Sequence, residues 1–261
     1  MLSGAVAGVL GGLFGIGGGI FLVPVLSIGF GLPMHQAIAA SIVAVIATSS
    51  ATASVYVDKG MSNIRLGMSL EVMTTIGAVL GGLAANELAG DALKKIFAVF
   101  LLCMGALMWW RSRTHGEGVI RVDPAASIHG SYFDEAEQRV VEYSVRKLGA
   151  GMLVSFFAGN MSGLLGVGGG IIKVPVMNMV CGVPIKASTA TSNLMIGVTA
   201  VASAFIFFLH GNVHPFYTAA AVLGVLGGSR VGTMLGAKIK GTTLIALFIV
   251  VIFATALRMF F

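Results

Sequence analysis

The stretch GGLFGIGGGIFLVPVL at residues 11–26 decides the fold, because it returns as GLLGVGGGIIKVPVMN at residues 163–178. A shift of 151 residues aligns residues 8–41 with residues 159–192 without a gap, and 15 of the 34 aligned positions are identical. Each copy contains a glycine triplet, at 17–19 and at 168–170. The chain is therefore predicted to contain two homologous transmembrane repeats, 1–110 and 148–261, joined by a polar linker at 111–147.

The composition points to a membrane protein. Of 261 residues, 57% are hydrophobic and 10% are charged, and the mean hydropathy is +0.97, whereas a soluble domain carries about 25% charged residues. A chain of this size cannot bury so much apolar surface within itself. A soluble globular protein, a disordered chain and a disulfide scaffold are excluded, and an all-α polytopic membrane protein is predicted, with a lipid bilayer around it and no nucleic-acid partner.

The apolar stretches predict how the chain crosses the bilayer. They fall near 2–32, 36–57, 66–88, 93–110, 148–182, 185–209, 216–237 and 241–261. Six of them suit one crossing of about 20 residues each. The first and the fifth are too long for one helix, and each is broken by a glycine triplet. We expect them to be discontinuous, re-entrant helices, each followed by three transmembrane helices.

The distribution of Lys and Arg favours this arrangement. If the broken segments re-enter, the basic residues outside the apolar stretches divide 11 against 3, with the larger number on the side of the linker. If both segments cross fully, the division is 9 against 5. Since cytoplasmic loops collect Lys and Arg, we expect inverted repeats with a cytoplasmic linker.

Other patterns give expectations about packing and about the linker. Gly81-Gly82 aligns with Gly227-Gly228 if the second half is five residues shorter. Glycines that recur every fourth residue, as in small-xxx-small motifs, are expected to pack helices together: Gly4, Gly8, Gly12, Gly224, Gly228, Gly232 and Gly236. In the linker, Asp134–Lys147 is predicted to be an amphipathic helix, and 118–133 a hairpin around Asp123-Pro124.

The glycine triplets carry the strongest functional prediction. A helix broken inside the bilayer leaves unpaired backbone groups, which survive where they line a cavity buried in protein. Glycine allows positive φ and a close approach of a ligand, and the helix that follows offers free N–H groups and a positive dipole end to an anion. Pro24 and Pro175 are expected in the first turn of that helix or at its end. The alternative is that the triplets only permit close packing.

Several side chains could complete such a site. Lys173 follows the second triplet, and because a charge at that depth is costly, we expect it to pair with the anionic substrate. The alternative is a lysine that snorkels to the interface. Arg230 lies in a later apolar stretch, where snorkelling to the interface is equally open to it. Glu71 is expected to pair with Arg65 or Lys59 at the interface, the alternative being a buried carboxylate that carries a proton. Polar residues that follow the motifs could bind the anion through hydrogen bonds: Ser41, Thr191, Ser192 and Asn193.

The doubled motif resembles that of the TauE/SafE sulfite-exporter family of membrane transporters. The resemblance covers both halves and implies a bacterial or archaeal inner-membrane, multi-pass transporter of small anions, often sulfur-containing. The glycines of the family pattern carry over onto Gly15, Gly17, Gly18, Gly19, Gly166, Gly168, Gly169 and Gly170, and its prolines onto Pro24 and Pro175. Lys173 departs from the general pattern, so the choice of substrate can differ here.

The two broken helices predict a secondary transporter of a small anion, and the resemblance implies an exporter whose substrate is sulfite or another sulfur oxyanion or sulfonate. It would work by alternating access around the two broken helices, with no cofactor, no metal and no catalytic residues, as a monomer or a homo-oligomer. An anion channel, or a transporter of a non-sulfur organic anion, is the alternative. The predicted substrate-binding residues are Gly17, Gly18, Gly19, Pro24, Ser41, Gly168, Gly169, Gly170, Lys173, Pro175, Thr191, Ser192, Asn193 and Arg230.

Overall fold

The computed structural model is helical almost throughout, and it describes residues 2–14, 17–114, 123–124 and 126–238. The predicted last crossing at 241–261 lies outside the described residues. In chain order the helices are α1 (Leu2–Phe14), α2 (Gly19–Pro24), the π-helical turn η1 (Val25–Gly29), α3 (Met34–Asp58), α4 (Ile64–Glu87), α5 (Gly90–Thr114), α6 (Leu148–Leu165), α7 (Gly170–Met179), α8 (Ile185–Leu209) and α9 (Pro215–Lys238). The strands are β1 (His129–Asp134) and β2 (Arg139–Ser144).

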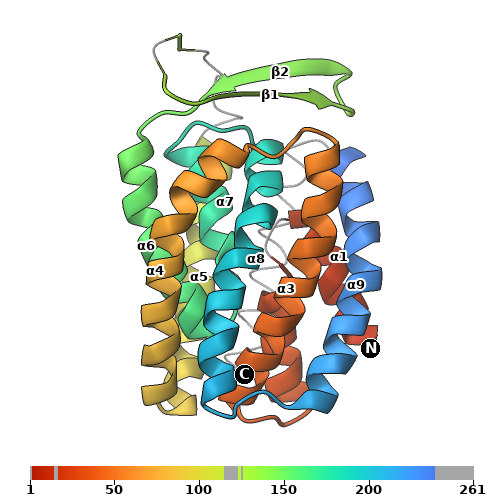
Figure 1. Ribbon diagram of the computed structural model, residues 1–261, viewed down its shortest axis with the longest axis vertical. Coiled ribbons are helices and arrows are strands. Elements are labelled where there is room, and N and C mark those ends of the chain that lie inside the picture. The colour runs from red at the N-terminus through yellow and green to blue at the C-terminus, as the bar shows by residue number, and fades with distance from the viewer. Residues whose placement is uncertain (1, 15–16, 115–122, 125, 239–261) are drawn as a thin grey trace.

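Five of these helices are long and apolar enough to cross a membrane: α3, α4, α6, α8 and α9. They stand side by side as a bundle (Figure 1). Large apolar side chains cover the outside of the bundle; Phe205, Phe208 and Phe216, for example, are more than half exposed. Since such a surface suits lipid and not water, the prediction of an all-α polytopic membrane protein is confirmed.

Each broken segment returns to the end of the bundle from which it started. The N–H of Arg146, just before α6, donates to the carbonyl of Cys181, just after α7, at 2.9 Å, at the end that carries the two strands (Figure 1). In the other half, a Cβ on Gly4 of α1 would contact Ala221 of α9. The ring of Phe30, just after η1, packs against Tyr217 of α9 at 6.1 Å. Both ends of the α1–α2–η1 segment therefore lie beside the start of α9, at the opposite end of the bundle.

Three pairs of corresponding elements in the two halves begin 151 residues apart. This holds for α2 and α7 (170 − 19), α3 and α8 (185 − 34), and α4 and α9 (215 − 64). The helix contacts follow the same offset: a Cβ on Gly77 of α4 would overlap the Phe156 carbonyl of α6, and one on Gly228 of α9 would overlap the Ala5 carbonyl of α1. The five-residue shortening expected from the alignment of Gly81-Gly82 is therefore wrong, because Gly81 corresponds to Gly232.

The polar linker forms an antiparallel β-hairpin across one end of the bundle (Figure 1). The prediction of a helix over 134–147 is wrong, and the turn lies after Asp134 instead of at Asp123-Pro124. The carboxylate of Asp134 accepts hydrogen bonds from the N–H groups of Ala136 (2.9 Å) and Glu137 (3.2 Å), which forms the turn. Tyr132, Val141 and Tyr143 are buried, and β-branched and aromatic residues in this alternation favour strands.

Candidate functional site

The two glycine triplets form tight loops that meet inside the bundle. Gly17 and Gly18 have φ values of 71° and 77°, and Gly168 and Gly169 both have 72°. This left-handed backbone, which glycine adopts without strain, lets the chain reverse direction and start a new helix at Gly19 and Gly170. A Cβ on Gly19 would lie 2.5 Å from the carbonyl oxygen of Gly166. The two loops are thus in backbone contact.

A serine of α3 spans both loops. The hydroxyl of Ser41 is 3.0 Å from the carbonyl oxygen of Gly166 and 3.3 Å from that of Gly19. Ser192 is buried at the corresponding position of α8. Since Ser41 comes from the first half and Gly166 from the second, the hydrogen bond joins the two halves at the place where their helices are interrupted.

α3 and α8 flank the loops with apolar side chains. A Cβ on Gly17 would meet Val45 of α3 at 2.8 Å and Ile196 of α8 at 3.3 Å, and one on Gly166 would meet Ile38 at 2.8 Å. These neighbours leave room for hydrogen but not for a methyl group. Both readings of the triplets, a ligand site and close packing, depend on this lack of Cβ atoms.

The two prolines lie farther along the half-helices than the first turn. Pro24 is the last residue of the six-residue α2, and the chain continues from it as the π-helical η1. Pro175 is buried within α7, which runs on to Met179. Because proline has no N–H, it removes one backbone hydrogen bond and favours such local changes of helix type. The expectation of a helix end holds for Pro24, whereas Pro175 matches neither expected position.

The polar residues of α8 have mainly structural partners. Thr191 accepts a hydrogen bond from the N–H of Asn63, just before α4, at 2.9 Å. The side-chain nitrogen of Asn193 donates to the Thr189 carbonyl of its own helix at 3.2 Å. The Oδ1 of Asn193 is buried and has no hydrogen-bond partner among the described residues. An amide oxygen left in this way is costly, so Asn193 retains the capacity to bind another donor.

Arg230 is not brought to the loops. Its side chain is exposed on the outside of α9, whereas Ser229 beside it is buried. The structure therefore gives Arg230 the position of a snorkelling residue and separates it from the other predicted site residues.

Lys173 lies beside the second loop and is held by an ion pair. Its Nζ is 3.2 Å from Oε2 of Glu71 on α4 and 2.6 Å from the hydroxyl oxygen of Thr199 on α8. A Cβ on Gly169 would lie 3.4 Å from Cε of Lys173, so the side chain folds back towards the glycine loop. The expected pairing of Glu71 with Arg65 or Lys59 is wrong: Glu71 pairs with Lys173, and Lys59 pairs with Glu135 at 2.7 Å.

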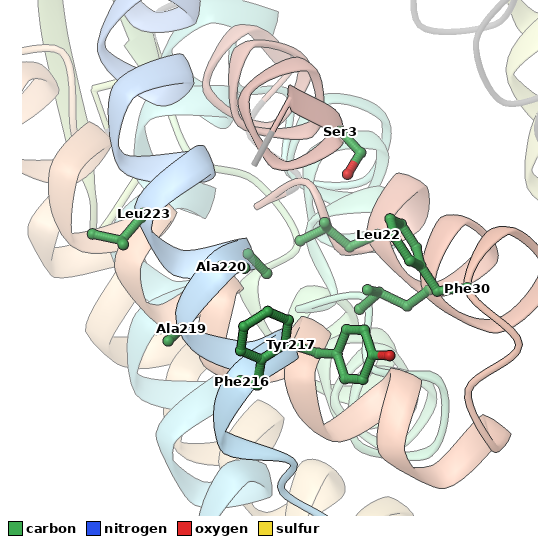
Figure 2. Close-up of a pocket in the computed structure, with 10 residues that line it drawn as sticks. Ser3, Leu22, Phe30, Phe216, Tyr217, Ala219, Ala220 and Leu223 are labelled. Atoms are coloured by element: carbon green, nitrogen blue, oxygen red, sulfur yellow. The ribbon is translucent and has the colours of Figure 1, made fainter.

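An apolar cavity of about 440 Å³ opens beside the first half-helix. Figure 2 shows Leu22, Phe30 and Tyr217 around it, contributed by α2, the chain after η1 and α9. Its lining is almost entirely aliphatic and aromatic, and it includes no charged side chain. This cavity lies beside the first half-helix rather than between the two glycine loops, and its chemistry does not suit an anion.

The β-hairpin is fixed over the end of the bundle by buried polar contacts. Nζ of Lys186, at the start of α8, donates to Oδ1 of Asp134 at 2.6 Å, and the side-chain nitrogen of Asn63 donates to the carbonyl of His129 at 3.2 Å. Burial raises the pKa of Asp134, but hydrogen bonds from Lys186, Ala136 and Glu137 and the charge of Lys186 outweigh it, so that the pKa lies below its usual 3.8. The hairpin thus caps both halves, through Lys186 of the second and Asn63 of the first.

Comparisons with known proteins find similarity to membrane transporters. The model of the family described as "Sulfite exporter TauE/SafE" matches residues 1–259. The "Probable membrane transporter protein YunE" of Bacillus subtilis is 23% identical over 97% of this chain and 93% of its own length. The "Probable membrane transporter protein MJ0441" of Methanocaldococcus jannaschii is 25% identical over 83% of this chain and 73% of its own length. No solved structure matches the chain. These names describe membrane transport and not catalysis.

Proposed function

Because the chain belongs to the TauE/SafE family of membrane transporters, we propose that it is a secondary transporter that exports a small anion, with sulfite or another sulfur oxyanion or sulfonate as the substrate. The observation that carries the proposal is the meeting of two glycine-broken helices inside the bundle, with Gly19 against the carbonyl of Gly166.

The two halves are proposed to be inverted repeats. The support is that the α1–η1 segment has both ends beside the start of α9, while the α6–α7 segment has both ends beside the hairpin. A re-entrant segment from each side places the two loops near the middle of the bundle. Transporters built from inverted repeats commonly bind their substrate at such a midplane junction of discontinuous helices.

Backbone N–H groups are proposed to bind the anion. The half-helices beginning at Gly19 and Gly170 have N-caps in the left-handed conformation, Gly18 and Gly169, with no side-chain cap. The first N–H groups of a helix lack partners within the helix, and the helix dipole adds a partial positive charge there. The other predicted binding residues are proposed to surround these two helix ends: Pro24, Pro175, Ser41, Ser192 and Asn193.

The structure is proposed to represent a closed state of the transporter. The loops are in contact and Ser41 lies against both, so an anion can enter only after they separate. Alternating access would arise from one half moving against the other around the loops. Export suits the membrane potential, because moving one unit charge across 100 mV changes the free energy by about 2.3 kcal/mol, and a negative interior expels an anion.

Purified protein in liposomes tests the proposal. Radioactive sulfite would be loaded inside, and its efflux measured against unlabelled sulfite, thiosulfate, sulfoacetate and acetate outside. We expect the sulfur anions to exchange with the label and acetate not to. Exchange by acetate with no response to any sulfur anion would contradict the sulfur assignment, and single-channel currents would replace the transporter with a channel.

A pair of matched glycine variants localises the site. Gly169→Ala places a methyl group in a left-handed position 3.3 Å from the Ala158 carbonyl, whereas Gly60→Ala introduces the same backbone strain, at φ +64°, with nothing within 4 Å. We expect efflux to fall by at least about tenfold in the first variant and to remain near wild type in the second, since the strain itself costs only about 1–2 kcal/mol. Equal efflux in both would argue that the loop does not contact the anion.

A further inference from the structure

The ion pair of Lys173 and Glu71 is unusual in its position. Both side chains are buried, and they come from helices of different halves, α7 and α4. Thr199 of α8 joins them: its hydroxyl donates to Oε1 of Glu71 at 2.5 Å and accepts from Nζ of Lys173 at 2.6 Å. Thr75 adds a second hydroxyl on Glu71 at 3.2 Å. The cluster is thus a buried network of balanced charge next to the second glycine loop.

The other half has no such network at the corresponding positions. Subtracting or adding 151 residues takes Lys173 to Leu22, Glu71 to Val222 and Thr199 to Thr48. Leu22 and Val222 belong to one apolar cluster, and Thr48 donates to the Ala44 carbonyl of its own helix at 3.0 Å. The packing of these helices therefore does not itself require an ion pair at this place.

A buried ion pair also contributes little to stability on balance. Removing two charges from water costs several kcal/mol per ion, which their mutual attraction barely offsets, and an apolar replacement of similar volume is often as stable or more so. Leu22 and Val222 are such a replacement. The pair is therefore better explained by function than by stability.

Electrostatics sets what can bind next to this pair. An anion that approaches Lys173 while Glu71 is ionised brings an uncompensated negative charge into a medium of low dielectric constant, where it is strongly disfavoured. If Glu71 takes up a proton, Lys173 is released as an unpaired ammonium, and the arriving anion restores neutrality. For a monovalent anion, the charges of Lys173, Glu71 and the anion then sum to zero when the anion and the proton are bound. The charges of Lys173 and Glu71 also sum to zero when both are absent.

We propose that Lys173 and Glu71 form the coupling site of the transporter, at which one anion binds to Lys173 and one proton binds to Glu71 in the same step. The inference rests on the proposed function and adds a coupling ion to it. The anion and the proton cross together, and the pair re-forms in the empty protein. For a monovalent anion the cycle moves no net charge, so its direction follows the anion and pH gradients. For a divalent anion one net negative charge crosses, and the membrane potential favours its export.

Among the described residues, the charged side chain that contacts Glu71 is Lys173. α8 contributes the hydroxyl of Thr199, and α4 itself contributes Thr75. α6 contributes Ala158 and Ser162 beside Gly169 and Cε of Lys173. No second carboxylate or histidine in the part of the chain that the structure describes is bonded to this network, so a proton taken up here belongs to Glu71.

Two measurements on Glu71→Gln in liposomes test the coupling. The first is exchange of radioactive sulfite between equal pools at equal pH, and the second is sulfite accumulation driven by a gradient of one pH unit, each corrected with protein-free liposomes. Because one pH unit corresponds to 1.36 kcal/mol, coupling to one proton supports about tenfold accumulation in the alkaline compartment. Glutamine imitates the protonated carboxyl, so we expect exchange to persist and accumulation to disappear.

Control variants separate coupling from a structural role. Glu87→Gln, an exposed change at the end of the same helix, should leave both measurements unchanged. Lys173→Met should abolish exchange, because the anion loses its ammonium partner. If Glu71→Gln fails to fold, Thr199→Val takes its place. This variant removes a hydrogen-bond donor to the carboxylate, so the pH profile of exchange should shift to higher pH. Ser203→Ala, one turn along α8, is its control and should leave the pH profile unshifted.

The outcomes distinguish this inference from the function on which it rests. A wild-type protein that exchanges sulfite but does not accumulate it along a pH gradient overturns the coupling and leaves the transporter. Gradient-driven accumulation that survives in folded Glu71→Gln also overturns it, as does an unshifted pH profile in Thr199→Val. A wild-type protein that exchanges no sulfur anion overturns the proposed function, and the coupling falls with it.

Discussion

The hydroxyl of Ser41 donates to the carbonyl oxygen of Gly166 at 3.0 Å, across the boundary between the two halves. Both residues are buried, and the glycine belongs to the loop that a Cβ on Gly19 would strike. This hydrogen bond lies where the two loops meet, which makes Ser41 the simplest place to disturb the contact that we propose to be a closed state.

Ser41→Ala should weaken the closed state. It leaves a buried carbonyl without its donor, which costs about 1–3 kcal/mol, so the thermal midpoint measured in detergent should fall. Ser50→Ala is the matched control, because Ser50 bonds to the Ile46 carbonyl of the same helix but is exposed. An equal midpoint in the two variants would show that the Ser41 bond does not hold the loops.

Gly77→Ala and Gly228→Ala should both prevent the protein from folding correctly. A methyl group at either position overlaps a backbone carbonyl of the neighbouring helix, Phe156 for the first and Ala5 for the second, and backbone cannot move aside cheaply. Gly227→Ala has nothing within 4 Å and should be neutral or slightly stabilising, because alanine favours helix by about 1 kcal/mol. Yields of monodisperse protein on size exclusion check all three, and a normal yield of Gly77→Ala would refute the close helix contact.

The hairpin should loosen in acid through Asp134. Its pKa is lowered in the folded protein, so the folded state binds the proton less readily than the unfolded state. The stabilisation is complete above the usual value of 3.8 and is lost as the pH falls below it. Hydrogen exchange at 129–144, corrected for intrinsic rates, should therefore rise between pH 5 and pH 3 in the wild type.

Asp134→Asn should exchange faster at neutral pH and show less of this dependence, whereas Glu142→Gln, exposed on β2, should retain it. The same acid response in Asp134→Asn as in the wild type would assign the effect to other carboxylates.

Cysteine labelling can decide how the broken segments cross. If the α6–α7 segment re-enters, Pro184 lies on the membrane side of the linker and Asp91 on the other; if it crosses fully, both lie on one side. We expect Pro184→Cys and Asp58→Cys to react with an impermeant thiol reagent from the same side, and Asp91→Cys and His214→Cys from the opposite side, in a background without Cys103 and Cys181. Labelling of Pro184→Cys together with Asp91→Cys would contradict the inverted arrangement.

The helices and their breaks could be predicted because their signals are local. Twenty apolar residues define a crossing, and three glycines define a break, wherever they lie. The hairpin was missed because its valines fit a helical spacing as well as a strand, while the signal for a turn lay in Asp134, whose carboxylate accepts from the next N–H groups.

The partner of Glu71 could not be predicted, because no sequence spacing relates it to Lys173, 102 residues away. The charges of Arg65 and Lys59 were nearer in sequence and gave the wrong pairing. The gapless offset of 151 residues, once extended through α4 and α9, is the signal that would have helped. It aligns Lys173 with Leu22 and Glu71 with Val222. The alignment therefore shows that the second position of each pair is apolar, and that the two charged residues have no charged counterpart.

A reversible cross-link between α3 and α8 tests whether the two glycine loops must part for the anion to pass. A Cβ on Gly197 of α8 would lie 3.6 Å from Cβ of Ser49 on α3, within the range of a disulfide. Of the two residues that flank Gly17, Val45 lies one turn from Ser49, and Ile196 is next to Gly197. The double variant Ser49→Cys/Gly197→Cys, without the native cysteines, is assayed for sulfite exchange in liposomes, with each single variant as a control. We expect oxidation to stop exchange and a reductant to restore it. Unchanged exchange in the fully oxidised double variant would contradict this expectation.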